Sequence, residues 1–191
     1  MKSFKYVSLG IFLMLFSFGC SQKQSNENEM DESMNNGTNY TKAVAVVHPT
    51  EGNTAMGTVT FEKVDDGIQV HAEFKGLSEG MHGFHIHLYG DCTASDGTSA
   101  GTHFNFEGSS LNPPADIDRI TGNLGNLNAN ADGEAIADTL IANAVLNGAK
   151  SIIGRAVIVH EKANDPSQPP IGAAGSRLGC GVIGIANTGT E

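Results

Sequence analysis

Alternating hydrophobic and polar positions mark the middle of the chain most clearly. Over residues 68–75, every second residue is hydrophobic and the residues between are polar or charged. This two-residue period is typical of a strand with one buried face. Residues 65–67 (Asp-Asp-Gly) form a hairpin signal, and the preceding segment, 56–64, carries Val59 and Phe61 on one face. The pattern therefore predicts two neighbouring antiparallel strands.

Short apolar and β-branched segments recur along the rest of the chain and predict further strands. These segments are 43–48, one around His85 and His87, 124–130, 135–141, 152–160 and 180–186. No apolar pattern with helical spacing runs beyond two turns. Two long irregular segments, 90–121 and 161–179, interrupt the strands, and such segments in a compact domain are usually functional. The sequence predicts an all-β fold, an Ig-like eight-stranded Greek-key β-sandwich or flattened barrel with two long functional loops.

The N-terminus has a different pattern. Lys2 and Lys5 precede an apolar run at residues 7–18, which is too short to span a bilayer and is typical of an export signal. Cys20 follows a glycine at the end of this run. A cysteine there resembles the lipobox of bacterial lipoproteins, although Ser17 stands where that pattern usually has Leu. The resemblance implies that Cys20 is the site of lipid attachment, and ordinary signal cleavage is the alternative.

The segment after the signal is polar and has almost no aliphatic residues. Residues 21–42 cannot bury enough surface to offset chain entropy, so we expect a flexible tether between the signal (1–20) and one domain (43–191). The formal net charge is -10, and no basic patch is present. This balance argues against nucleic-acid binding and against direct adhesion to anionic lipid. We expect an exported protein that touches the membrane only through a lipid anchor and faces the periplasm or the cell exterior.

Cys92 and Cys180 remain once Cys20 is assigned to the lipid. In an exported, oxidising setting, two such cysteines form a disulfide by default. A bridge across so long a loop would stabilise the fold by roughly 4 to 5 kcal/mol in the chain-entropy model. The alternative is a pair of thiolate metal ligands.

Four histidines fall where the predicted strands meet the long loops. His85 and His87 lie two residues apart, so a strand would present both imidazoles on one face. Two imidazoles cannot complete a coordination sphere, and the further candidates are His103 in the first loop and His160 at a strand end. Ligation by nitrogen alone suits Cu(II), with Zn(II) and Ni(II) as alternatives.

From residue 43 to residue 186 the sequence resembles the copper–zinc superoxide dismutase family. The matching motifs are GFHIHLYGDC, SAGTHFN, GNLGN, IIGRAVIVHEKA and GSRLGCGVIGIA. The resemblance implies that the four histidines are the copper ligands and that Cys92 and Cys180 form the internal disulfide. It also implies two catalytic residues: Arg177 draws the anionic substrate to copper, and His103 exchanges copper for a proton during turnover.

The family's zinc site is where this sequence departs from the pattern. No histidine occurs between His103 and His160. The family's zinc-ligand positions fall on Leu111, Ile120 and Asn123. Aliphatic side chains cannot bind a metal, and a neutral amide is a poor zinc ligand. Asn164 replaces the carboxylate that links the two metal sites in the family. We interpret the chain as a lipoprotein-type, copper-only relative with one copper ion and no zinc.

Loss of zinc would leave the second nitrogen of His103 without the partner that fixes its tautomer. The candidate partners in the same loop are Glu107, Asp116 and Asp118. His82 matches a family histidine with a structural role, and we interpret it as a hydrogen-bonded residue. His48 and His71 lie on predicted strands without partners, and we interpret them as surface or hydrogen-bonded residues.

The predicted function is that of an antioxidant enzyme, a superoxide dismutase, which converts superoxide into dioxygen and hydrogen peroxide at a single copper ion. The net charge of -10 does not forbid an anionic substrate, because the local field near the cleft decides steering. Residues 163–174 hold no Lys or Arg, so capture should depend strongly on Arg177. The alternatives are a copper-binding lipoprotein that buffers or delivers the metal, and a structural sandwich that kept its histidines by descent. Arg177 favours the enzyme, since a copper buffer needs no anion guide.

Overall fold

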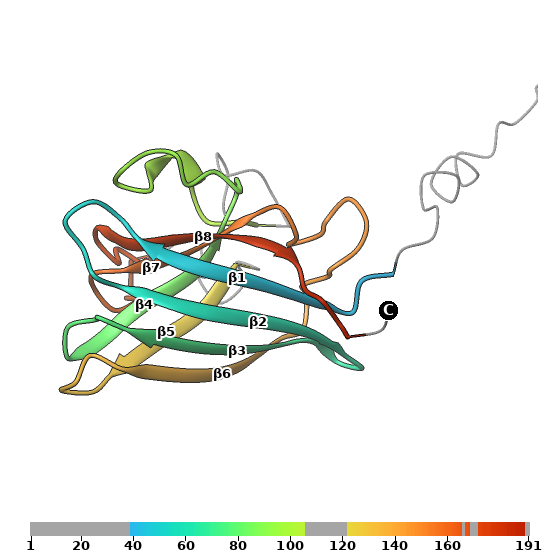
Figure 1. Cartoon of the computed structure of the whole chain (residues 1–191), viewed down its shortest axis with the longest axis horizontal. Coiled ribbons are helices and arrows are strands. Elements are labelled where there is room, and N and C mark those ends of the chain that lie inside the picture. The colour runs from blue at the N-terminus through green and yellow to red at the C-terminus, as the bar shows by residue number, and fades with distance from the viewer. Residues whose placement is uncertain (1–38, 106–121, 166, 169–171, 190–191) are drawn as a thin grey trace, which may run out of the picture. The chain divides into compact units, whose positions relative to one another are not determined.

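Strands are the main regular elements of the chain in the computed structural model, which describes residues 39–105, 122–165, 167–168 and 172–189 (Figure 1). Within these ranges the strands are β1 (Lys42–Pro49), β2 (Met56–Val64), β3 (Gly67–Lys75), β4 (Gly80–His87), β5 (Asn123–Ala129), β6 (Ala135–Ile141), β7 (Ala156–His160) and β8 (Arg177–Ile185). A single turn of 3₁₀-helix, η1 (Thr98–Ala100), lies in the first long loop.

The eight strands form one continuous antiparallel sheet. Their order is β5-β4-β7-β8-β1-β2-β3-β6, so β8 pairs with β7 in one layer and with β1 in the other. The two edge strands, β5 and β6, follow one another in the sequence and are joined by a tight turn between Asn130 and Glu134. The sheet therefore curls into a nearly closed, flattened barrel (Figure 1). This architecture confirms the predicted all-β, eight-stranded fold.

The core lies between the two layers and follows the alternation seen in the sequence. On β3, Ile68, Val70, Ala72 and Phe74 are buried. Phe61 of β2 is fully buried and pairs with Val70 in the ladder, which confirms the predicted β2–β3 hairpin. Phe74 and Phe84 meet edge to face with ring centroids 5.6 Å apart and join the layers. Each such large side chain contributes about 1.5 to 3 kcal/mol when it leaves water.

Two strands begin three or more residues away from their predicted starts, whereas the other predicted bounds differ by at most one residue. The strand predicted over residues 152–160 begins only at Ala156, because residues 152–155 form a turn in which Gly154 has a φ of 85°. The last strand was expected to begin at residue 180, but it begins at Arg177. Arg177 pairs with His160 across the ladder, which holds it in the sheet rather than in the loop. The Arg177 backbone is therefore part of the sheet, next to the candidate ligand His160.

Some predictions concern residues outside the described ranges. These are the signal segment with Cys20, the first part of the tether, the zinc-position residues Leu111 and Ile120, and the loop carboxylates Glu107, Asp116 and Asp118. The tether was expected to reach residue 42, whereas β1 already includes Lys42. In the described part of the chain, no helix has the length and apolar character needed to cross a bilayer.

Candidate metal centre

β4 and β7 carry three of the four candidate ligands. Phe84 and Ile86 of β4 point into the core, so the alternate residues His85 and His87 lie on the opposite, loop-covered face. The pairing of β4 with β5 shifts register between Gly83 and His85, and that of β7 with β8 shifts between Val159 and His160. Such irregularities bend a strand and re-aim side chains. Each of the two strands, β4 and β7, therefore has one register shift directly beside a candidate ligand.

The first long loop brings His103 to the end of β4. His103 forms an isolated antiparallel bridge with His87. The neighbouring backbone bonds are Leu88 N–H to Thr102 O (2.8 Å) and Phe104 N–H to Ile86 O (2.9 Å). This short stretch of extra strand fixes the third ligand by backbone hydrogen bonds rather than by side-chain packing alone.

The four predicted copper ligands, His85, His87, His103 and His160, converge on one buried point. One ring nitrogen from each lies within 4.8 Å of all the others. Their residues are at most 6% exposed. The His85 and His103 rings stack with centroids 3.8 Å apart, and His87 and His160 stack at 5.4 Å. Among the described residues this is the one group of three or more metal-ligating side chains that meets these distances.

The hydrogen bonds of His87 and His160 leave lone pairs of these two rings directed at each other. His87 donates its Nδ1–H to Gly101 O at 2.9 Å, and His160 donates its Nδ1–H to Gly175 O at 3.3 Å. Their Nε2 atoms, which then carry lone pairs, face each other at 3.3 Å. The Nδ1 atoms of His85 and His103 are buried and have no hydrogen-bond partner among the described residues. Unpaired buried nitrogens are costly, and a bound cation would satisfy them.

Burial keeps all four imidazoles neutral. It lowers the pKa of His103 to about 3, with His160 and Arg177 as further causes. The pKa of His160 falls to about 4, again mainly through burial, although the Gly175 hydrogen bond opposes the shift. The pKa values of His85 and His87 also lie well below the usual range, first through burial and then through the neighbouring imidazoles. Neutral imidazole is the form that binds metal ions.

An open cavity of about 550 Å³ leads to the cluster and is lined by His87, His103, His160 and Arg177. Arg177 donates from Nη1 to Gly97 O and from Nη2 to Gly101 O, the latter at 2.6 Å. The Gly101 carbonyl therefore accepts from both Arg177 and His87. Gly101 has a φ of 75°, and a Cβ there would lie 2.8 Å from the Tyr89 ring. A glycine is required at this junction.

A disulfide joins Cys92 to Cys180, with Cα atoms 5.8 Å apart. This is the predicted pairing, and it excludes the alternative of two thiolate ligands. The bridge ties the first long loop to β8, three residues after Arg177. Ala100 of η1 packs with Ile158 and Cys180 in a small buried cluster below the loop. The disulfide thus holds the loop that carries the carbonyl partners of Arg177.

Asn123 and Asn164, two positions where the sequence departs from the family pattern, contact each other beside His85. Asn164 Nδ2 donates to Asn123 Oδ1 at 2.9 Å, and Asn164 Oδ1 lies 2.6 Å from His85 Nε2. The Asn164 backbone N–H donates to Asn126 Oδ1 at 2.7 Å. Asn126 closes the GNLGN motif, but the sequence alone assigned it no role. The carbonyls of Gly101 and Gly175 were also missed, because a backbone acceptor leaves no side-chain signature.

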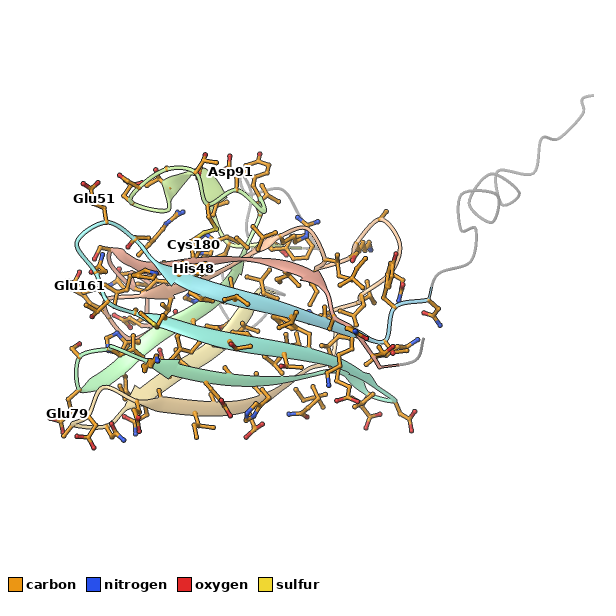
Figure 2. The ribbon with its side chains drawn as sticks, viewed as in Figure 1. His48, Glu51, Glu79, Asp91, Glu161 and Cys180 are labelled. Carbon is orange, nitrogen blue, oxygen red and sulfur yellow. A yellow bond between two sulfur atoms is a disulfide. The ribbon has the colours of Figure 1, made fainter. Side chains whose placement is uncertain are left out.

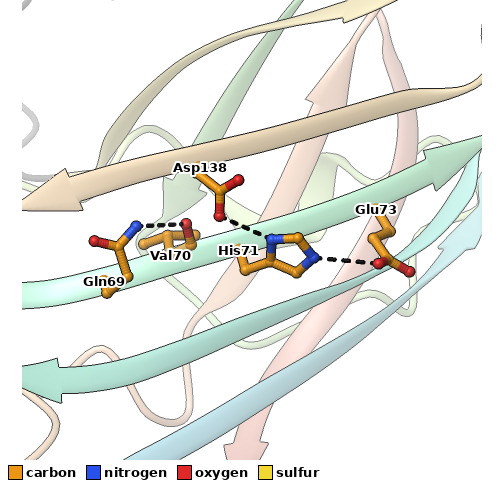
Figure 3. Close-up of polar contacts among 5 residues, drawn as sticks. All are labelled: Gln69, Val70, His71, Glu73 and Asp138. Atoms are coloured by element: carbon orange, nitrogen blue, oxygen red, sulfur yellow. Dashed lines mark hydrogen bonds and ion pairs between the residues drawn. The ribbon is translucent and has the colours of Figure 1, made fainter.

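The other histidines have ordinary environments, as predicted. Buried His82 donates its Nδ1–H to the His160 carbonyl at 2.8 Å, and its Nε2 lies 3.2 Å from the Ser78 hydroxyl, which can donate to it. His48 is exposed on β1 and pairs in the ladder with Cys180 (Figure 2). His71 is exposed on β3, where it does have partners, the carboxylates of Asp138 and Glu73 (Figure 3).

Comparisons with known proteins agree with this geometry. Residues 55–183 match the family model described as copper/zinc superoxide dismutase. The chain is 35% identical to the "Extracellular superoxide dismutase [Cu-Zn]" of Brugia pahangi over 94% of this chain and 98% of that protein. It also resembles the crystal structure of the "clock protein EA4", with a TM-score of 0.67 and 38% identity over 78% of this chain and 98% of that one.

Proposed function

The chain belongs to the copper/zinc superoxide dismutase family, and we propose that it disproportionates superoxide at a single copper ion held by His85, His87, His103 and His160. Family membership makes it a superoxide dismutase, an oxidoreductase. The single-ion centre is supported most directly by the four buried imidazoles, whose nitrogens lie within 4.8 Å of one another. Neutral nitrogen ligands suit copper.

Copper in this centre would supply a one-electron redox couple. The overall reaction converts two superoxide anions and two protons into one dioxygen and one hydrogen peroxide. Arg177 places its positive charge in the cavity wall, beside His87 and His103, where an entering anion is attracted. Its two carbonyl partners, Gly97 and Gly101, hold the guanidinium in place. We assign the second catalytic role to His103, which lines the same open cavity and would relay one of the two protons from solvent to the reduced product, so that its ring is neutral before and after turnover.

Zinc is absent from the proposed centre. The chain has no histidine between His103 and His160. Asn123, at one family zinc position, already uses Oδ1 to accept from the Gly125 N–H at 3.1 Å and from Asn164 Nδ2 at 2.9 Å. An amide oxygen engaged in two hydrogen bonds is a poor zinc ligand, so this part of the chain does not fit a zinc ion. Leu111 and Ile120 offer no donor atom.

We further propose that the enzyme is an exported lipoprotein. Residues 1–20 would act as the signal, Cys20 would carry the lipid, and residues 21–42 would tether the domain (43–191) to the membrane. The extracellular relative from Brugia pahangi supports export. Replacing Cys20 with Ala should move the protein from the membrane fraction to the soluble fraction, whereas an unchanged distribution would contradict lipid anchoring.

Metal analysis combined with a direct superoxide assay tests the function. The metal-free protein would be incubated with equimolar Cu(II) and Zn(II), desalted, analysed for both metals and mixed with superoxide in a stopped-flow instrument. We expect one copper per chain, no stoichiometric zinc and accelerated superoxide decay.

Three other outcomes of that experiment would contradict the proposed function or the single-ion centre. Copper bound at one per chain without acceleration would indicate a copper-buffering lipoprotein instead of an enzyme. Stoichiometric zinc together with copper would overturn the single-ion centre. A chain that binds no copper would contradict both metal functions.

A further inference from the structure

Three amide side chains, from Asn123, Asn126 and Asn164, lie next to the metal centre. Asn164 is the hub: its side chain bonds His85 and Asn123, and its backbone N–H bonds Asn126. We propose that Asn164 is a positioning residue that holds the His85 ring in the tautomer with a proton on Nε2, so that the buried Nδ1 is left as the metal ligand. This inference deepens the proposed single-copper function and rests on it.

Backbone groups fix the direction of every hydrogen bond in this network. The Gly125 N–H can only donate, so the Asn123 atom that it contacts at 3.1 Å is the oxygen, Oδ1. The Gly125 carbonyl can only accept, so the Asn164 atom 3.2 Å away is the nitrogen, Nδ2. That same Nδ2 donates to Asn123 Oδ1 at 2.9 Å. Both ends of the network therefore orient the Asn164 amide in the same way.

The orientation of Asn164 determines where the His85 proton lies. With Nδ2 turned to Gly125 and Asn123, the Oδ1 atom faces His85 Nε2 at 2.6 Å. An amide oxygen cannot donate, so His85 Nε2 carries the proton. A neutral imidazole has only one N–H, which leaves a lone pair on His85 Nδ1. That atom is buried and has no hydrogen-bond partner among the described residues.

His87 and His160 also have one fixed tautomer each, but backbone carbonyls fix it. These rings donate from Nδ1 to the carbonyls of Gly101 and Gly175, so their lone pairs lie on Nε2. His85 is the one ring of the three whose proton is fixed by a side chain. An amide does this without adding a negative charge beside a buried cluster of neutral rings. It can also donate to two acceptors at once, which a carboxylate cannot do.

The inference can be tested in the metal-free protein by nitrogen-15 NMR of the histidine rings. Long-range proton–nitrogen correlations distinguish a protonated ring nitrogen from a bare one. We expect His85 to be protonated at Nε2 alone in the natural protein. In Asn164→Ala the His85 ring should populate both tautomers, and copper affinity should fall by about 10- to 100-fold, the usual cost of losing such a partner. Asn164→Asp keeps an oxygen acceptor for Nε2–H and should retain the single tautomer.

Three controls accompany these variants. Asn128→Ala changes an exposed asparagine on β5, the strand that carries Asn123 and Asn126, and should leave the His85 tautomer and copper affinity unchanged. The His87 ring, held by the Gly101 carbonyl, is an internal reference for a folded site in every sample. The bond from the Asn164 backbone N–H to Asn126 does not involve the Asn164 side chain, so the loop stays attached in Asn164→Ala.

The results separate this inference from the proposed function. If His85 keeps its single tautomer and its copper affinity in Asn164→Ala, the positioning role is wrong. The tautomer is read without metal, so it does not depend on which metal the centre takes. Failure of the copper and zinc analysis would overturn the proposed function, whereas a fixed tautomer in Asn164→Ala would overturn only the role of Asn164.

Discussion

Within one domain, the pKa values of the buried histidines in the metal centre and of the exposed His71 on β3 are shifted in opposite directions. Burial lowers the pKa values of all four rings in the centre, to about 3 for His103 and about 4 for His160. At His71 the hydrogen bond to Asp138, followed by that to Glu73, raises the pKa (Figure 3). Imidazole is thus kept neutral and able to bind a metal ion in the centre, whereas it binds a proton more tightly at position 71.

The difference comes from what each ring can contact. His71 lies on the outer face of the sheet, paired in the ladder with Asp138 and two residues from Glu73, so two carboxylates reach it. The described contacts of the centre are carbonyls, amides and other imidazoles. Those groups orient the rings without stabilising the imidazolium form. Desolvation then dominates and keeps the lone pairs available.

The largest expected effect comes from removing one buried ring. His87→Ala should abolish stoichiometric copper binding and reduce superoxide turnover by at least about 100-fold, because a ligand and the Gly101 bond are lost together. The matched variant, His71→Ala, removes a histidine of the same sheet and should leave copper content and turnover unchanged. Metal analysis and stopped-flow assays measure both. Equal losses in the two variants would contradict the distinction between the two environments.

Removing the disulfide should have the second-largest effect, this time on the stability of the fold. Cys92 and Cys180 are 88 residues apart in sequence. Replacing both with Ser should lower the free energy of unfolding by about 4 to 5 kcal/mol in the chain-entropy model. Urea unfolding of the metal-free protein measures this loss. We also expect weaker anion capture, because the first loop holds Gly97 and Gly101 against Arg177. Unchanged unfolding midpoints would contradict a stabilising role for the disulfide.

Replacing Arg177 should have the third-largest effect, which falls on the rate of the reaction with superoxide and not on metal binding. Arg177→Ala should lower kcat/KM for superoxide by about tenfold, the low end of the range for electrostatic steering, and should flatten its dependence on salt. Arg177→Lys keeps the charge but not the paired bonds to two carbonyls, and should retain an intermediate rate. An unchanged rate in Arg177→Ala would remove this residue from the mechanism. Copper content should be the same in all three proteins.

Much of this arrangement was predictable from the sequence, and the reasons are physical. The alternation on β3 depends only on which side chains avoid water, so its faces and its pairing with β2 were correct. The four histidines were identified because ligand chemistry restricts residue type. The start of β8 at Arg177 was missed, since pairing with His160 is a tertiary contact with no local signal. The roles of the Gly101 carbonyl and Asn126 were missed for the same reason.

The smallest expected effect concerns His71 and the pH dependence of stability. A pKa that is raised in the folded state stabilises the fold below the unfolded value of about 6.5, and this contribution is lost as pH rises through the folded pKa. The His71 side chain is 44% exposed and that of Asp138 is 63% exposed, so solvent screening limits the contribution to about 0.2 to 1 kcal/mol. Urea unfolding of the metal-free protein at several pH values from 5.5 to 8.5 would measure it.

Comparing variants isolates His71 from the buried rings, whose own titration changes stability in the opposite direction. Lowered pKa values make the folded state bind fewer protons than the unfolded state, so the centre favours folding less as pH falls below about 6.5. The difference between the natural protein and Asp138→Asn cancels that common background. This difference should be largest at the acidic end and shrink as pH rises. Glu73→Gln should give a smaller difference, because the Asp138 bond is shorter, 2.8 Å against 3.2 Å. A difference that does not vary with pH would show that His71 does not bind its proton more tightly in the fold.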